Sequence, residues 1–316
     1  MFLKIKTTLI ILIADAGIVL SQQLPVSNQY LVNRHFLSPA YSGFTGNFEA
    51  FITYQKNCLN FPGGPEYKSF YASGPVYGNM SLGMSVSKSS VTIFNGFSAQ
   101  MDYAYHLKLN EKQYIHFGLS CEYIENYLGI DNQTYSIQSD PYIMKYGHTF
   151  NTGFGLIYTY KTFQIGFVIP RMLESRIRNS ETDASFYSIP RLLRMHASCL
   201  FDINQSLSLE PTAIVDKSSV QPLWYNGSVL LKYKEITWLE MHYSQGGIMG
   251  FGLGVNFSRK LLFNYTYEFS GTGLMKYSSG NHEISIGFLI GKNSDRKYQK
   301  SAFRPPSKQP YYDWIK

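Results

Sequence analysis

Ionisable side chains recur at alternate positions within apolar segments of this sequence, and they are its candidates for chemistry. Most are carboxylates, and the set comprises Glu49, Asp102, Glu122, Arg194, His196, Glu210, Glu240, Glu268 and Glu283. Paired carboxylates can act as general acid and base, and histidines grouped with carboxylates can hold a metal ion. These residues come from many different segments, however, and no two histidines lie at metal-ligand spacing. We therefore expect no catalytic residue, no metal site and no cofactor, and interpret the set as a polar, hydrogen-bonded interior.

Other motifs that carry chemistry are missing from the sequence. It has no Gly-x-Ser-x-Gly nucleophile motif and no glycine-rich phosphate loop. Its three cysteines, Cys58, Cys121 and Cys199, are too few and too scattered for a disulfide framework or a paired-cysteine zinc site. We expect Cys121 and Cys199 to be packing residues and the protein not to be an enzyme.

Alternation of apolar and polar residues dominates the segments that position these side chains. From Phe97 to Leu107, for example, the odd positions are mainly apolar and the even positions mainly polar. A period of two puts each set on its own face of a sheet. The pattern predicts fourteen strands, at residues 47–56, 66–74, 78–88, 96–107, 113–123, 150–160, 162–170, 191–202, 206–216, 224–233, 235–243, 248–257, 260–269 and 281–291.

The lengths of these strands and of their connections favour a membrane barrel. A tilted strand needs about 9–11 residues to cross a bilayer, whereas globular strands average about 5–6. Short connections alternate with longer ones, which is typical of outer-membrane barrels with tight periplasmic turns and long external loops. The long connections are residues 57–65, 124–149, 171–190 and 270–280. Pro211, inside a predicted strand, suggests a bulge or a strand edge.

Composition agrees with this class. Only 16% of the residues are charged and 16% are aromatic, whereas a soluble domain carries about 25% charge. After the first 20 residues no apolar run of about 18 occurs, which argues against membrane helices. We predict an all-β fold, a single transmembrane antiparallel β-barrel of about 14 strands over residues 47–291. Its apolar face meets lipid, its ionisable residues line the lumen, and both termini are periplasmic.

Both ends of the chain differ from the barrel. Residues 1–21 have a basic start and an apolar run, which predicts a signal peptide cleaved near Ser21/Gln22; the alternative is a membrane anchor. Residues 292–316 form a tail with seven basic and two acidic residues, so it accounts for +5 of the formal net charge of +7. We therefore expect no nucleic-acid partner. The tail is either a disordered end or a periplasmic docking strip, with Arg296, Lys297, Arg304 and Trp314 as candidate contacts.

Residues 22–46 lie between the predicted signal peptide and the first strand, and they do not alternate. Pro39 disfavours helix at the preceding residue, and Gly43 can release the chain into the strand. One interpretation is a periplasmic lead-in whose aromatic residues pack against the barrel mouth. The other is a plug or partner-docking segment. In either case the candidate contact residues are Tyr30, Phe36, Pro39, Ala40, Tyr41 and Gly43.

Several short motifs, in a fixed order along the chain, resemble the PorP/SprF family of Bacteroidota outer-membrane proteins. They lie at residues 28–31, 38–43, 63–65, 73–75, 103–107, 166–170, 207–211 and 277–284. Two departures stand out. Ser38 replaces the family's usual Asn before Pro39, and the usual Arg and Trp are missing around residues 55–59. The absence of the Arg and Trp favours an accessory paralogue.

The resemblance implies a component or accessory of the type IX secretion system and gliding machinery. Expected partners are outer-membrane lipid and other secretion components, namely the translocon and a PorK- and PorN-like periplasmic ring, or a dedicated secreted adhesin. Such a protein would bind partners and support the secretion or surface anchoring of cargo. A polar lumen alone also fits the alternative, an outer-membrane porin or a small-solute transport barrel.

Overall fold

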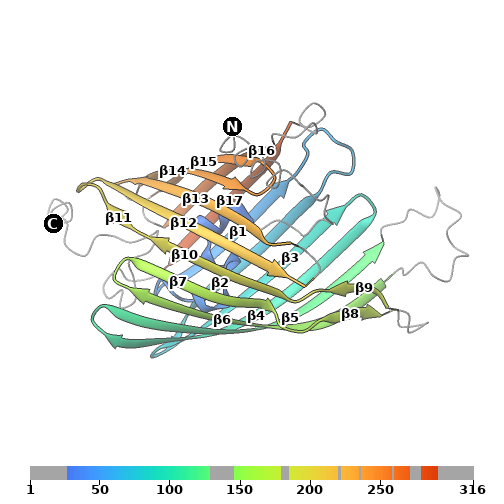
Figure 1. Cartoon of the computed structure of the whole chain (residues 1–316), viewed down its shortest axis with the longest axis horizontal. Coiled ribbons are helices and arrows are strands. Elements are labelled where there is room, and N and C mark those ends of the chain that lie inside the picture. Colours follow the sequence, from blue (N-terminus) through green and yellow to red (C-terminus); the bar gives the residue numbers. More distant parts are fainter. Residues whose placement is uncertain are drawn as a thin grey trace, which may run out of the picture.

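Strands of one antiparallel sheet make up most of the chain in the computed structural model, which describes residues 27–128, 146–178, 185–219, 222–234, 236–257, 260–270 and 279–290. The first strand, β1 (Phe48–Lys56), hydrogen-bonds on one side to β2 (Glu66–Tyr77) and on the other to β17 (Asn281–Ile290). The sheet therefore closes on itself as a barrel (Figure 1). Closure leaves no open edge, which is what a sheet needs in order to cross a bilayer.

The seventeen strand elements amount to fourteen barrel strands. Three short elements only continue longer ones: β8 follows β7 alongside β6, β9 leads into β10, and β11 continues β10 alongside β12. The predicted barrel of fourteen antiparallel strands is confirmed. The remaining strands are β3 (Met80–Val91), β4 (Phe94–Asn110), β5 (Gln113–Leu128), β6 (Tyr146–Tyr160), β7 (Phe163–Arg171), β8 (Ser175–Arg178), β9 (Ser185–Ile189), β10 (Leu192–Cys199), β11 (Phe201–Asp202), β12 (Leu207–Ser218), β13 (Trp224–Tyr233), β14 (Thr237–Ser244), β15 (Ile248–Phe257) and β16 (Leu261–Ser270).

Connections at one rim of the barrel are tight turns. Lys161 and Lys234 occupy such turns with φ near +52° and +51°, a conformation that reverses the chain within a few residues. At the other rim the predicted alternation of loop lengths is not strict, because Thr92 and Ile93 alone join β3 to β4. Both strands continue past their predicted ends, so most of the expected loop is strand. Below, the two ends are called the short-turn rim and the long-loop rim.

Pro211 lies within β12, where the expected bulge does not occur but the ladder on one side has no partner for it. The register between β12 and its neighbour is unchanged from Ser198↔Thr212 to Phe201↔Leu209. Instead, the neighbouring strand is interrupted at Leu200, whose N–H donates to the Thr162 carbonyl at 3.1 Å. A proline has no N–H for the ladder, so it is tolerated beside a break in the partner strand.

The two faces of the barrel differ sharply. Large apolar side chains point outward and are exposed, as with Met101 at 70% and Leu253 at 58%. Exposure of this extent would be unfavourable in water but suits a lipid environment. Side chains at the inward positions are mainly polar and buried. Within the described residues, no helix is long and apolar enough to cross a membrane.

Candidate functional site

Residues 27–46, called the lumen segment below, fold into three short 3₁₀ turns inside the barrel. The turns are η1 (Asn28–Leu31), η2 (Arg34–Phe36) and η3 (Pro39–Tyr41). Each begins at a capping side chain, from Ser27, Asn33 and Ser38 respectively, that accepts a hydrogen bond from the N–H two residues later. Such caps satisfy N–H groups that a short turn leaves free. Side chains within the segment therefore help to set the shape of each turn.

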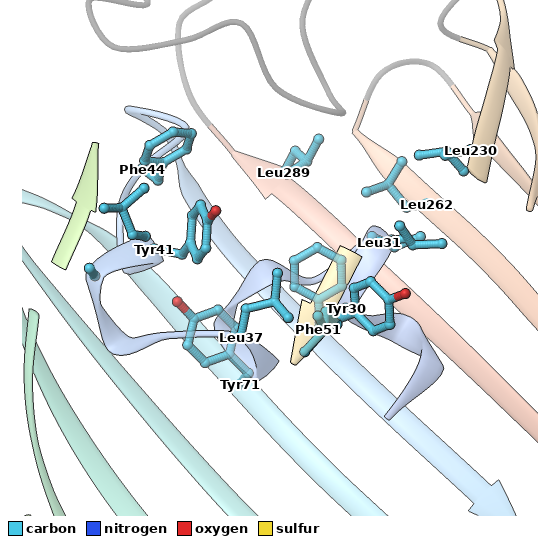
Figure 2. Close-up of a cluster of buried hydrophobic side chains, with 14 of the residues drawn as sticks. Tyr30, Leu31, Leu37, Tyr41, Phe44, Phe51, Tyr71, Leu230, Leu262 and Leu289 are labelled. Carbon is cyan, nitrogen blue, oxygen red and sulfur yellow. The ribbon is translucent and has the colours of Figure 1, made fainter. Parts of the chain in front are cut away.

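An apolar cluster anchors the lumen segment. Figure 2 shows Tyr30, Leu31 and Leu37 lying across the strands, close to Phe51 of β1. Tyr30 is 1% exposed and Leu31 2%. The barrel supplies inward apolar side chains from strands all around the lumen, namely Phe51, Tyr71, Ile157, Ile214, Leu230, Trp238, Leu262 and Leu289. Burial of several large side chains provides the main driving force for seating the segment.

The first turn is held by the last two strands. The Asn28 N–H donates to Glu283 of β17 at 3.1 Å, and its side-chain amide donates to Glu268 of β16 at 3.3 Å. Ser27 also donates to Glu283. Gln29 donates to Thr266 at 3.1 Å and accepts from Asn264 at 3.0 Å. Hydrogen bonds to carboxylates are stronger than neutral ones, so β16 and β17 fix this end of the segment.

A buried ion-pair group holds the second turn. Arg34 pairs with Glu210 of β12 and donates to Gln164 of β7 at 2.7 Å. Lys232 of β13 contacts the other oxygen of Glu210 at 2.8 Å. Burial alone would lower the pKa of Arg34, but the adjacent Glu210 carboxylate raises it above its ordinary value. The segment's cation is thus fully charged and shares one carboxylate with a cation of the wall.

The third turn meets the opposite wall. The Tyr41 hydroxyl lies 3.0 Å from His196 Nε2 of β10, and Ser42 donates to Asp102 of β4 at 3.2 Å. The Gly43 N–H donates to Ser73 of β2 at 3.0 Å. Contacts of the segment therefore reach strands from β1 to β17 around the full circumference. Only a position inside the barrel allows this.

Two glycines of the wall make room for the third turn. A Cβ added at Gly118 of β5 would lie 2.6 Å from both the Pro39 carbonyl carbon and the Ala40 Cα. At Gly155 of β6, an added Cβ would overlap the Ser38 Oγ. Side chains rarely tolerate such short distances, so Gly118 permits the backbone of the segment to lie directly on the sheet.

The structure brings most of the candidate residues together. In the lumen segment, Tyr30, Pro39, Ala40, Tyr41 and Gly43 are buried and Phe36 is half-buried. All nine ionisable candidates of the wall are buried inside the barrel. Seven touch the lumen segment by hydrogen bond or ion pair, namely Glu49, Asp102, Arg194, His196, Glu210, Glu268 and Glu283.

The other candidates do not meet the lumen segment. Glu122 is paired instead with Arg171 of β7 at 3.0 Å, and Glu240 accepts from Asn264 at 3.1 Å. The tail candidates Arg296, Lys297, Arg304 and Trp314 lie outside the described residues, as does the predicted signal peptide.

Sequence reasoning missed several residues of the site. Arg34 is the most important, and its position as a lone arginine in an otherwise uncharged stretch was a usable signal. Two wall histidines, His106 and His116, face each other with Nδ1 atoms 2.9 Å apart, and His106 Nε2 lies 3.0 Å from the Ser42 carbonyl. In the part of the chain that the structure describes, no three His, Cys, Asp or Glu side chains are grouped to hold a metal ion.

A closed barrel with an apolar outer face and a polar interior defines an integral outer-membrane β-barrel protein. Within this class the chain belongs to the PorP/SprF family, whose model, a type IX secretion system membrane protein, matches residues 19–288. The predicted family is confirmed. No curated protein sequence gives a significant match.

The chain is similar to several solved outer-membrane barrels at low sequence identity. The monoaromatic hydrocarbon channel CymD is 11% identical with a TM-score of 0.54, over 87% of this chain and 95% of that one. A Pseudomonas aeruginosa FadL homologue is 10% identical with a TM-score of 0.49, over 84% and 94%. The P. putida toluene transporter TodX is 11% identical with a TM-score of 0.46, over 81% and 93%. Similarity at this level concerns the fold alone.

Proposed function

We propose that this protein is a plugged outer-membrane barrel that binds partner proteins of the type IX secretion system and supports the secretion or surface anchoring of cargo such as an adhesin. Family membership supports the secretion role. The observation that carries the proposal is the lumen segment itself, which lies inside the barrel and contacts strands around its whole circumference. A segment held across the lumen in this way supports binding at the rims over the conduction of solutes.

The proposed orientation puts the short-turn rim in the periplasm and the long-loop rim outside the cell. Outer-membrane barrels generally have tight periplasmic turns and longer external loops. With fourteen strands, both ends of the barrel lie at the short-turn rim, where Phe48 begins β1 opposite Ile290 of β17. Periplasmic components, including a PorK- and PorN-like ring, would then meet the short-turn rim, and exported cargo the long-loop rim.

Deletion of the gene followed by surface proteomics tests the secretion role. We expect loss of at least one type IX cargo from the cell surface and its accumulation in the periplasm. Native co-purification would identify partners and separate a core component from a cargo-specific one. Unchanged display of every type IX cargo would contradict the proposal.

Point variants separate assembly of the barrel from secretion. Tyr41→Phe removes the hydroxyl that meets His196 inside the lumen, whereas Tyr103→Phe alters an outward tyrosine of β4 and is the matched control. We expect both variants to assemble and only Tyr41→Phe to reduce partner recovery in pull-downs. Equal recovery with both variants would separate the lumen segment from partner binding.

The basic tail is the second proposed contact. Residues 293–316 would present Arg296, Lys297 and Arg304 to an acidic periplasmic partner. Truncation of these residues should lower recovery of that partner at low salt more than at high salt, because exposed charge contacts are screened. Recovery that does not change on truncation would leave the tail without a docking role.

Transport remains the alternative function, and the polar lining of the lumen favours it. Planar-bilayer conductance of the purified protein distinguishes the two. We expect a closed barrel, whereas steady open-channel current would support a porin or small-solute channel.

A further inference from the structure

A row of lysines crosses the outer face of three neighbouring strands at the long-loop rim. On β3, four apolar outward residues precede Lys88. On β2 and β1, toward the same rim, the outward positions also change from apolar to charged, at Lys68 and at Lys56. The outward positions below them are Met80, Leu82, Met84 and Val86 on β3, Phe70, Ala72, Gly74 and Val76 on β2, and Phe48, Ala50, Ile52 and Tyr54 on β1. In the register, Lys68 lies opposite Lys88, and Lys56 lies two residues beyond Tyr54, the partner of Lys68.

The lysines of this row lie near the boundary of the bilayer. Eight residues separate Met80 from Lys88, which is about 26 Å along a strand, or about 19 Å along the axis for a tilt of about 45°. The apolar band of an outer-membrane barrel is about 25 Å tall, and a lysine side chain can extend several ångströms toward the surface. The ammonium groups therefore reach the headgroup layer.

Within β1, β2 and β3, the lysines of this row outnumber the carboxylates. Lys68 and Lys88 stand directly opposite each other in the β2–β3 register, and both are exposed. Like charges at directly opposed positions destabilise a sheet. Glu66 is the row's single carboxylate, and it lies 2.6 Å from Lys68 Nζ and 3.6 Å from Lys56 Nζ. The three lysines and one glutamate leave a net charge of +2 at this site.

We propose that Lys68 and Lys88, supported by Lys56, bind the phosphate group of a lipid in the leaflet at the long-loop rim. A phosphate between the two opposed ammonium groups would supply the missing negative charge. The Tyr54 ring holds the Lys68 ammonium group in place, since Lys68 Nζ lies 5.6 Å from the centroid of that ring. Phe70 and Val86, one outward position closer to the membrane, would contact the acyl chains. A lipid is favoured over an acidic protein because the site faces outward at the bilayer boundary. The inference does not depend on the secretion role.

Lipid binding to the purified full-length protein in detergent, counted by native mass spectrometry, tests the site. The probe is diphosphoryl lipid A, compared with the same lipid after removal of its phosphates. The variant is Lys68→Gln/Lys88→Gln. Its matched control is Lys161→Gln/Lys234→Gln, because those lysines also lie over tyrosine rings, at 5.4 and 5.2 Å, but at the opposite rim.

We expect the Lys68/Lys88 variant to bind diphosphoryl lipid A about 30-fold more weakly, from the contribution of two lysines at an anionic surface. The Lys161/Lys234 variant should stay within about twofold of the wild type. Equal binding by the Lys68/Lys88 variant, an equal loss in the control, or equal binding of the dephosphorylated lipid would each overturn the proposal. Competition by inorganic phosphate at the lipid's own concentration, or binding of polyglutamate without binding of lipid, would also overturn it.

Discussion

Glu210 holds the lumen segment by electrostatics, and neutralising it should release the segment. In the seated state this carboxylate contacts Arg34 of the segment and Lys232 of the wall. The Glu210 side chain is 2% exposed, that of Lys232 3% and that of Arg34 10%. Glu210→Gln keeps the shape of the side chain but leaves two buried cations side by side without a carboxylate.

The size of the effect follows from burial. Removing one partner of a buried ion pair costs about 3–5 kcal/mol, because the remaining charge has no compensation. The released state escapes this cost, since Arg34 then enters water. The population of the released state should therefore rise about 150- to 5,000-fold. Arg34→Met should have a smaller effect of about 10- to 150-fold, because Glu210 keeps its contact with Lys232 and only charge-assisted hydrogen bonds are lost.

Thiol labelling measures this population. Val32 is 3% exposed in the lumen segment and close to cysteine in size, so Val32→Cys provides a buried reporter. The three native cysteines, Cys58, Cys121 and Cys199, are free and would be replaced by alanine. A water-soluble maleimide then reacts only when the segment leaves its seat, so the labelling rate follows the released fraction.

The order of the variants is the decisive result. Labelling should increase from the reporter background to Arg34→Met and again to Glu210→Gln. Lys56→Gln, which breaks an ion pair with Glu66 at the outer face, should behave as the background. A Glu210→Gln rate within threefold of the background, or one below that of Arg34→Met, would refute the electrostatic account of the seat.

Two further predictions concern the same segment. Gly118→Val should prevent the third turn from binding to the barrel wall, because the added Cβ would overlap the backbone of Ala40. The barrel should still form, as judged by heat-modifiable migration in gels. Its conductance in planar bilayers should rise. Gly227→Val is the control, because an added Cβ there has no atom within 4 Å, and a conductance equal to that of Gly118→Val would argue against the steric explanation. Burial raises the pKa of the Tyr30 and Tyr41 phenols, so they should ionise later than the ordinary value of about 10 in an absorbance titration. The bound position of the lumen segment is then fully stable below about pH 10, and its stability falls as the pH rises further. Tyr30→Phe and Tyr41→Phe should each remove one phenol that titrates above the ordinary pKa. A titration that these variants leave unchanged would contradict the burial of the two phenols.

Alternation predicted all fourteen barrel strands because a membrane imposes one apolar and one polar face on each. The same rule explains the errors at strand ends. β5 continues to Leu128 and β4 begins at Phe94, both past the expected limits. Beyond the bilayer both faces of a strand meet water, so alternation is lost although the hydrogen-bonded ladder continues.

The wall residues that bind the lumen segment could be predicted only in part. The carboxylates that bind the lumen segment were identified because they alternate with the apolar residues of their strands. In a strand that crosses a membrane, an ionisable residue has to face the lumen and not the lipid. The pairing of Arg34 with Glu210 joins residues 176 apart in sequence, and that of Asn28 with Glu283 joins residues 255 apart. Three short 3₁₀ turns have no periodicity that would indicate such partners.

The contacts of the lumen segment also set an order of events during biogenesis. The segment is synthesised before any strand, yet the partners of its first turn lie on β16 and β17, the last strands to be made. Those partners reach their final positions only when β17 pairs with β1. A barrel that lacks its last strands therefore leaves Ser27, Asn28 and Gln29 without their hydrogen-bond partners. Through this dependence, the lumen segment takes its final position only after the last strands are in place.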